Sequence, residues 1–588
     1  MNTANTNPIN PITKLDYPDP DVICVDNTYY MASTTMYFMP GCEILRSYDL
    51  VHWEHAAYVY DKLDSTPAQR LEGKENIYGQ GMWAASLRYH DGYFFVVFVC
   101  NDTHKTYVYT SRSIDGPWEK NYLEGFYHDN SVLFDDDGRI YIVSGNKDIY
   151  LKELFLLKTE HGVTLTDIAN RNNITSSSDS CERNNGHSEA VSDDNTTLIV
   201  SDSEDVYLGY EGAHFYKLNG KYYIFLIHMP KSTGKRTEAV FVADKPQGPY
   251  IGKDVMDDDR GYRRSGVAQG GIVQTPGGKW YSILFQDSGA VGRIPVLMPV
   301  TWKGTDTSDF TFGIASADVK PFSSVNFPVF GDNGIIPETF EIEDLRPGYE
   351  YTNLVGSDDY MDGDGDSFGF KSCWQFNHEP DLSLIKRNLD KGTVTITTDK
   401  LCDNLVQAKN VLTQRTLFPG CSCSVDIDAS NLNNGDYAGL CVLESNYCFI
   451  AVTKRDDKFF LVQGSRKITT GGFWGERHDT EGFDENACVE IETPIVTLKA
   501  EVCYDSKLLN TKDADTLTDD DSAMFSYSIN RNGQLGTVSN QIAPSRFGLA
   551  NKLQFKLDHF TGARFGLFIY STKKEGGSAT FSNFVYMQ

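Results

Sequence analysis

Residues 213–223, AHFYKLNGKYY, have the pattern of a β-hairpin: an aromatic strand, a tip at Asn219-Gly220 and a second aromatic strand. Asn-Gly between two such runs is a strong short-range hairpin signal, because the tip residues must tolerate a positive φ. The pattern recurs at residues 22–30, 86–94, 131–141 and 271–281. Almost no segment of the chain is typical of a helix. Five repeated hairpins predict five β-units arranged radially, as in a five-bladed β-propeller.

A second repeat follows several of these hairpins and predicts the turn before the outer strand of a four-stranded unit. Its copies are residues 46–53, 113–118 and 243–250. The spacing between repeats is irregular and is widest across Asn172–Asp205. Unequal spacing argues against a solenoid of equal repeats, whereas a propeller tolerates loop insertions. We therefore predict a propeller over residues 1–325.

The pattern changes in the second half of the chain. Several prolines interrupt residues 326–356, which predicts a linker without regular structure. From residue 357 short alternating segments return, such as Thr393–Thr397 and Phe565–Tyr570. They predict a second domain over residues 357–588, a two-sheet, jelly-roll-like β-sandwich. The predicted fold class is all-β throughout.

The composition limits the range of partners. The chain has 588 residues, and its 81 acidic against 53 basic residues give a formal charge of −28. Such a charge repels a phosphate backbone and an anionic membrane surface, so we expect neither nucleic acid nor membrane as a partner. Aromatic residues make up 13% of the chain and supply flat faces on which sugar rings can stack. The sequence leaves the oligomeric state open.

The start of the chain and the cysteines bear on the compartment. The first residues lack the basic region and apolar core of a secretory signal. The twelve cysteines are dispersed through strand-like stretches without paired CxxC units, which favours buried free thiols and a reducing compartment. We expect a cytoplasmic protein, or a periplasmic or secreted one if a signal has been removed.

Three acidic residues stand beside hydrophobic strands in three different units: Asp19, Asp129 and Glu211. A radial fold can bring all three together. Breaking a glycosidic bond requires a carboxylic acid that protonates the leaving oxygen and a carboxylate that activates water or attacks carbon. A third carboxylate can raise the pKa of the acid by like-charge repulsion. The sequence therefore predicts a glycosidase centre.

Each assignment has a structural alternative. Asp between prolines commonly shapes a loop, and Asp21 competes with Asp19 for the catalytic role but is expected to begin the following strand. Glu211 could be a solvated strand end. Asp135–Asp137 compete with Asp129, and we interpret them as a hairpin tip. The presence of all three motifs in one chain favours catalysis.

At these residues the chain resembles glycoside hydrolase family 43, the inverting β-xylosidases and α-L-arabinofuranosidases built on a five-bladed propeller. The quoted motifs are PDPDV at 18–22, HDNSVLFDDDGRIY at 128–141 and LGYEGAHFYKLNGKYYIF at 208–225. The resemblance implies that Asp19 is the general base, that Glu211 is the general acid, and that Asp129 tunes the pKa of the acid and orients it.

The resemblance also implies substrate-binding residues. Trp83, in GMWAASLRYHDG, corresponds to a tryptophan that flanks the sugar, with packing in the core as the alternative. Arg293, in GAVGRIP, corresponds to an arginine that contacts substrate hydroxyls, with a surface ion pair as the alternative. The second half is similar to the sandwich of the xylosidase-like members, in which a loop presents a phenylalanine to the active site. Phe560 is the candidate here.

The chain departs from the family pattern at one place. Many members have a histidine on the propeller axis that supports a calcium ion or a water cluster, whereas this chain has Gln269 in the stretch GVAQGG. An amide oxygen can serve calcium. The acidic stretch Asp358–Asp366 is either a structural calcium loop or a solvated turn, because it lacks the flanking helices of an EF-hand. No spacing of histidines predicts zinc. No cofactor is required, and a structural calcium is an open alternative.

We therefore predict an inverting exo-glycosidase that removes terminal β-D-xylosyl or α-L-arabinofuranosyl units from xylan or arabinoxylan oligosaccharides. Two alternatives remain. One is an endo-acting arabinanase on the same propeller, which the sandwich disfavours by closing one side of the pocket. The other is a non-catalytic sugar-binding propeller, because a fold alone carries no function. The sequence does not distinguish xylose from arabinofuranose.

Overall fold

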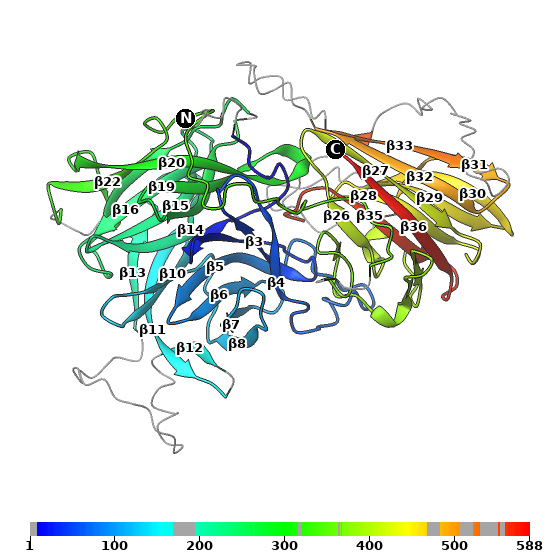
Figure 1. Ribbon diagram of the computed structural model, residues 1–588, viewed down its shortest axis with the longest axis horizontal. Coiled ribbons are helices and arrows are strands. Elements are labelled where there is room, and N and C mark those ends of the chain that lie inside the picture. Colours follow the sequence, from blue (N-terminus) through cyan, green and yellow to red (C-terminus); the bar gives the residue numbers. More distant parts are fainter. Residues whose placement is uncertain are drawn as a thin grey trace.

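The computed structural model describes residues 9–588 except 161, 168–194, 263, 315–319, 363–364, 366, 467–481, 505–520, 530–550 and 553–558. The described residues form an all-β structure, as predicted, with only three short 3-10 helices: Gly289–Val291, Leu382–Leu384 and Leu405–Gln407. No helix among them is long and apolar enough to cross a membrane. Figure 1 shows two lobes, one blue to green and one yellow to red.

The first lobe contains five antiparallel sheets. The first sheet is β1 (Asp21–Val25), β2 (Thr28–Ser33), β3 (Gly41–Ser47) and β4 (Glu54–Tyr60). The second is β5 (Met82–His90), β6 (Tyr93–Cys100), β7 (Lys105–Ser111) and β8 (Glu119–Leu123). The third is β9 (Ser131–Phe134), β10 (Ile140–Asn146), β11 (Asp148–Lys158), β12 (Val163–Asp167) and β13 (Thr196–Ser201).

The last two sheets of this lobe use strands that are not consecutive in the chain. The fourth is β14 (Val206–Leu218), β15 (Lys221–Pro230), β16 (Thr237–Ala243), β17 (Ile251–Met256) and β21 (Thr311–Phe312). The fifth is β18 (Val267–Gln274), β19 (Trp280–Asp287), β20 (Arg293–Asp306) and β22 (Ser324–Phe330). The predicted domain boundary at residue 325 therefore falls inside β22, which pairs with β20 over its whole length.

All five predicted hairpins are confirmed, and each is the first hairpin of a sheet. The predicted outer turns are also confirmed, because they connect the third to the fourth strand of the first, second and fourth sheets. The first strands contact one another in cyclic order: β1 with β5, β5 with β9, β9 with β14, β14 with β18, and β18 with β1. Residues at the start of these five strands therefore converge.

The second lobe contains two seven-stranded sheets, which confirms the predicted two-sheet sandwich. One comprises β23 (Gln375–Phe376), β26 (Leu412–Arg415), β28 (Asp436–Leu443), β29 (Cys448–Arg455), β30 (Lys458–Ser465), β31 (Asp484–Ile491) and β35 (Arg564–Ser571). The other comprises β24 (Ile385–Asn388), β25 (Thr393–Thr397), β27 (Gly420–Asp428), β32 (Ile495–Cys503), β33 (Ser522–Ile529), β34 (Asn551–Lys552) and β36 (Ser578–Met587).

The two lobes share a continuous interface. One apolar cluster joins Tyr17 and Trp53 of the first lobe to Trp374 of the second, and Met39 and Phe376 exchange two backbone hydrogen bonds. Burying apolar surface on both sides in this way stabilises the lobes against separation.

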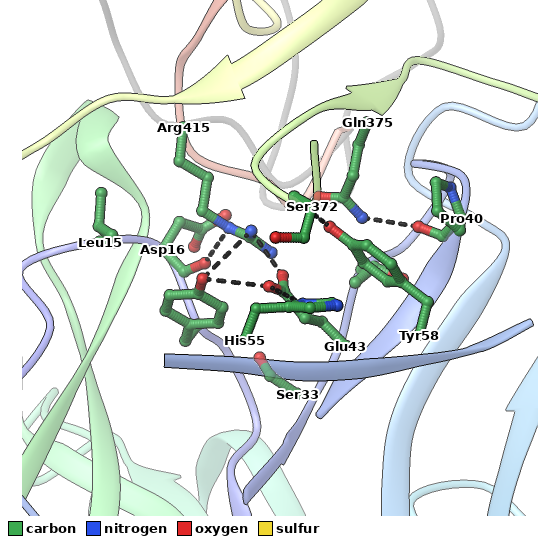
Figure 2. Close-up of polar contacts among 12 residues, drawn as sticks. Leu15, Asp16, Ser33, Pro40, Glu43, His55, Tyr58, Ser372, Gln375 and Arg415 are labelled. Atoms are coloured by element: carbon green, nitrogen blue, oxygen red, sulfur yellow. Dashed lines mark hydrogen bonds and ion pairs between the residues drawn. The ribbon is translucent and has the colours of Figure 1, made fainter. Parts of the chain in front are cut away.

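A polar cluster lies within the same interface (Figure 2). The Arg415 guanidinium of the sandwich donates to the Glu43 carboxylate of β3 at 2.7 Å, and His55 lies 3.0 Å from the other Glu43 oxygen. Burial raises the pKa of Glu43, but Arg415 and His55 outweigh this effect and hold the pKa at about 2. The ion pair thus joins residues that are far apart in the chain.

Candidate active site

Asp19 lies two residues before β1, between Pro18 and Pro20, with a φ of 51°. Its side chain is buried, and its Oδ1 accepts a hydrogen bond from Arg293 at 3.0 Å. Arg293 begins β20 and is held in turn by Asp287, whose Oδ1 is 3.2 Å from the arginine Nε. The guanidinium fixes the orientation of the Asp19 carboxyl, as a general base requires.

The rival residue Asp21 has a structural role. It begins β1 and is buried, and its carboxylate accepts from Arg88 at 2.6 Å and from the backbone N–H of Leu87 at 2.7 Å. His214 of β14 lies 3.2 Å from its other oxygen. Asp21 therefore joins β1 to β5 and β14 and has its oxygens fully occupied. Asp135 lies just before the turn of the third hairpin, as predicted, with Lys217 and Tyr222 as partners.

The other two predicted carboxylates meet at His128. Asp129 lies two residues before β9, with a φ of 47°, and Glu211 lies within β14. His128 Nε2 lies 3.4 Å from Glu211 Oε2 and 3.8 Å from Asp129 Oδ1. Asn146 donates to the same oxygen of Glu211. The carboxyls of the second and third motifs thus face one another across a single imidazole.

The electrostatics of this cluster connect all three acidic residues. Burial raises the pKa of Asp129, the charge of His128 opposes this effect, and the Glu211 and Asp19 carboxylates raise the pKa further, to about 7. Conversely, burial lowers the pKa of His128, but Asp129 and Glu211 raise it to about 9. His128 therefore carries a proton at neutral pH, and Asp129 keeps its proton to a pH near 7.

Irregular backbone aims these side chains at one place. Asp19, Asp129, Gln269 and Phe560 all have φ values between 47° and 60°, in the left-handed region that non-glycine residues rarely adopt. The β14–β15 register shifts on both sides of Glu211, and the β5–β6 register shifts after Trp83. Bulges re-aim side chains beside active sites, and strained residues persist where the surrounding structure holds them. Positive φ values thus occur at Asp19 and Asp129, and register shifts flank Glu211.

Aromatic rings form one wall of the site. The Trp83 ring centroid is 5.3 Å from that of Phe560 and 5.7 Å from that of His128. The Arg293 guanidinium lies over the Phe560 ring at 5.8 Å and over Phe285 at 4.5 Å. Phe560 belongs to the sandwich, so the second domain contributes a ring to a site built on the first. The structure thus brings together all six residues predicted for catalysis and substrate binding.

Gln269 is buried in β18, and its backbone N–H donates to Glu238 at 2.9 Å. A Cβ at Gly212, beside Glu211, would lie 2.7 Å from the Gln269 side chain, so this side chain packs against the backbone of the catalytic strand. Among the described residues, the group of His, Cys, Asp or Glu side chains arranged closely enough to hold a metal ion is His128, Asp129 and Glu211. The alternative calcium loop at Asp358–Asp366 falls partly outside the described residues.

Three functional contacts were missing from the sequence prediction. His128 bridges two of the carboxyls, Asn146 donates to Glu211, and Asp287 holds Arg293. His128 stands directly before Asp129 in the second motif, so its position in the sequence could have indicated that it lies at the site. Asn146 and Asp287 end their strands without a motif of their own, so only the fold brings them to the site.

Comparison with known proteins assigns the class. Residues 8–307 match the glycosyl hydrolases family 43, and residues 366–587 match the β-xylosidase C-terminal concanavalin A-like domain. The chain belongs to glycoside hydrolase family 43 and is a glycosidase. Its substrates are accordingly oligosaccharides.

Individual relatives cover most of the chain. A putative β-xylosidase of Xylanibacter ruminicola is 26% identical and covers 78% of this chain and 76% of its own length. A non-reducing-end α-L-arabinofuranosidase of Bacteroides ovatus is 22% identical over 76% of each. Among solved structures, a bifunctional GH43-CE protein of Bacteroides eggerthii is 33% identical with a TM-score of 0.76, covering 99% of this chain. This chain spans 64% of that protein.

Proposed function

We propose that the protein is an inverting exo-glycosidase that removes terminal β-D-xylosyl or α-L-arabinofuranosyl residues from xylan or arabinoxylan oligosaccharides. The relatives named β-xylosidase and α-L-arabinofuranosidase support this substrate class. The observation that carries the mechanism is the meeting of Asp19, Asp129 and Glu211 in one coupled cluster. Asp19 and Asp129 precede the first strands of two sheets, and Glu211 lies in the first strand of a third.

In the proposed mechanism Asp19 is the general base. The Arg293 guanidinium, 3.0 Å from Asp19, fixes the orientation of the carboxyl. Asp19 removes a proton from water as the water attacks the anomeric carbon. Inversion requires the two working carboxyls to stand about 6.5–9.5 Å apart, so that the water fits between one of them and the sugar. No covalent intermediate forms.

Glu211 is the general acid and protonates the leaving oxygen. This role requires a proton on Glu211 when substrate binds. The neighbouring Asp129 and His128, whose pKa values are raised to about 7 and about 9, keep protons in the same cluster near neutral pH. His128 and Asn146 orient the Glu211 carboxyl through the contacts at its Oε2. His128 also carries a positive charge that limits the total charge of the pocket.

The architecture supports exo action. We propose that the five sheets are the blades of a five-bladed propeller, supported by the cyclic contacts of their first strands. The proposed catalytic propeller covers residues 1–325 and the rest of β22 to Phe330, the linker runs from there to residue 356, and residues 357–588 form the sandwich. Because Phe560 of the sandwich stands beside Trp83, the sandwich closes one side of the pocket, which disfavours a polymer threading through, as an endo-arabinanase requires.

We propose no organic cofactor. Gln269 is the candidate to offer an amide oxygen to a structural calcium on the axis. A reducing, cytoplasmic location is proposed from the cysteines, because the eleven that the structure describes are all free thiols.

The test is hydrolysis of p-nitrophenyl β-D-xyloside and p-nitrophenyl α-L-arabinofuranoside, compared side by side, together with xylobiose and linear arabinan. The proposal expects release of single sugars from at least one nitrophenyl glycoside and from xylobiose. Depolymerisation of arabinan without action on either nitrophenyl glycoside would replace it with the endo-arabinanase.

A further inference from the structure

Asp16 lies three residues before Asp19 and is buried at the junction of the two lobes, with 4% of its surface exposed. Its Oδ1 accepts a hydrogen bond from the backbone N–H of Arg293 at 2.8 Å. Its Oδ2 accepts one from the backbone N–H of Gly562 at 2.9 Å. One carboxylate therefore holds the arginine of the active site with one oxygen and the sandwich loop that carries Phe560 with the other.

The surrounding backbone extends this contact on both sides. Tyr17 donates its N–H to the carbonyl of Arg293 at 2.9 Å, and Ala563 donates to the carbonyl of Ala290 at 2.7 Å. Arg415 Nε donates to the carbonyl of Asp16 at 2.8 Å, as Figure 2 shows. Asp16 is thus fixed from the sandwich side as well as from the propeller side.

The glycines at this contact leave no room for side chains. A Cβ at Gly562 would overlap the Val291 carbonyl and approach Asp16, and a Cβ at Gly292 would overlap the Asp16 carboxylate. Gly292 also has a φ of 102°, which disfavours other residues. The close approach of three chain segments is therefore specific to the residues present.

Two buried backbone N–H groups pointing at one side chain are best matched by a carboxylate, because both of its oxygens accept. An asparagine of the same shape can accept with one oxygen only, and its amide group would face the second donor. A buried N–H that is left without a partner destabilises the fold, because the free energy of removing it from water is not offset by a hydrogen bond. A substitution that weakens either hydrogen bond of Asp16 therefore frees the loop at Gly562 or the backbone of Arg293.

We propose that Asp16 is a positioning residue that seats the sandwich loop 559–563, and with it Phe560, against Arg293 and so sets the substrate pocket. The inference rests on the proposed function, since the pocket is the one that holds the terminal sugar. Asp16 touches no substrate. It acts by fixing the distance between the Phe560 ring and the Trp83 and Arg293 side chains.

The test compares Asp16→Asn with the wild type in the full chain. The variant should raise KM for the nitrophenyl glycoside that the wild type cleaves, with kcat nearly unchanged, because the ring contacts ground state and transition state alike. We expect a loss in kcat/KM of about 10-fold, the equivalent of one unsatisfied buried donor. Gly562→Ala leaves the Asp16 carboxylate in place but displaces the loop by overlap with the Val291 carbonyl, and it should give the same KM shift.

A double-mutant cycle shows whether Asp16 affects KM through Phe560 or through Arg293. In the Phe560→Ala background, Asp16→Asn should cost less than about 2-fold, because the ring that it positions is gone. An undiminished loss in that background would mean that Asp16 acts through Arg293 alone and would overturn the inference. So would an unchanged KM in both Asp16→Asn and Gly562→Ala.

A readout that needs no activity separates this inference from the proposed function. Amide hydrogen exchange of residues 559–566 should accelerate at least about 10-fold in Asp16→Asn. The matched control is Asp436→Asn, because Asp436 is a buried carboxylate that accepts a backbone hydrogen bond from Asn433 within the sandwich. It should lower the melting temperature without changing KM or exchange in the loop.

A wild type that cleaves neither glycoside refutes the proposed function, while unaltered loop exchange in Asp16→Asn refutes the inference.

Discussion

Two buried acidic clusters lie in this molecule, and they behave in opposite ways. At the domain interface, Glu43 has a cation or an imidazole at each oxygen, and its pKa is held at about 2. In the active site, Asp129 shares its surroundings with two further carboxyls, and its pKa is raised to about 7. Glu43 lies within the regular strand β3, whereas Asp129 has a left-handed backbone.

The comparison shows that burial alone does not decide what a carboxyl does. Burial raises the pKa in both clusters, and the partners decide whether the result is a stable ion pair or a site that retains a proton. The interface cluster contributes to stability through pairing. The catalytic cluster carries an unfavourable arrangement of charges, which is useful only for proton transfer.

The largest expected effect separates the two working carboxyls. Glu211→Gln should lose about 10²–10⁴-fold in kcat/KM on xylobiose, whose sugar leaving group needs protonation, and far less on a nitrophenyl glycoside. Asp19→Asn should lose a similar factor on both substrates, because water activation is needed whatever group leaves. If Asp19→Asn is the leaving-group-dependent variant, the acid and the base must be exchanged.

The next effect concerns the stability of the interface. The pKa of Glu43 in the folded protein lies below its unfolded value of 4.5, so its stabilisation is fully present above pH 4.5 and is lost as the pH falls toward 2. Glu43→Gln should reduce the free energy of unfolding by about 3 kcal/mol at pH 7, the equivalent of this pKa difference. Chemical denaturation should show that the loss in the free energy of unfolding is smaller at pH 3 than at pH 7. A constant deficit would mean that Glu43 is not held ionised by Arg415.

The contribution of Asp129 to stability should depend on pH in the opposite direction to that of Glu43. Its pKa in the folded protein lies above its unfolded value of 3.8, so its contribution to stability is present below pH 3.8 and is lost as the pH rises through 7. Asp129→Asn should therefore gain stability relative to the wild type between pH 4 and pH 8, by about 2 kcal/mol after allowance for coupling.

The same Asp129→Asn change should alter catalysis. Loss of the Asp129 carboxylate should shift the basic limb of the pH–rate profile toward acid, because it removes a negative charge from the cluster. Melting temperatures and pH–rate profiles measured on one preparation test both effects. A variant that is destabilised at pH 8, with an unshifted profile, would remove Asp129 from the electrostatic account.

The smallest effect sets the baseline for the comparison. The pair of Lys458 and Glu490 has a 3.0 Å contact on the sandwich surface, with both side chains more than half exposed. Lys458→Ala should change the free energy of unfolding by less than about 1 kcal/mol, since exposed ion pairs contribute little. A loss equal to that of Glu43→Gln would show that pairing rather than burial carries the interface effect.

The sequence predicted what is encoded locally. The hairpins are signalled by Asn, Asp and Gly at their tips, and Asp19, Asp129 and Glu211 stand in compact motifs beside those hairpins. What it could not predict depends on contacts between distant segments. Glu43 and Arg415 are 372 residues apart, and Asp16 meets Gly562 across 546 residues. Neither pair has a local signal, because Glu43, Arg415 and Asp16 alone are typical of surface charges and Gly562 alone is typical of a loop.

The raised pKa of Asp129 also depends on contacts that the sequence does not reveal. The structure raises the pKa of Asp129, which is more deeply buried than Glu211 and lies near both other carboxyls. The identity of the carboxyls was available from the sequence. Their relative burial was not, since it depends on how His128 and the sheets enclose them.

The central claim is that Asp19 and Glu211 act on opposite sides of the sugar with water between them. Proton NMR of the first minutes of hydrolysis of the preferred nitrophenyl glycoside tests it directly, because the anomeric protons of the two product configurations are resolved before mutarotation. The account predicts the anomer opposite to that of the substrate. Initial release of the anomer with the substrate's own configuration, or a glycosyl adduct on Asp19, would contradict it.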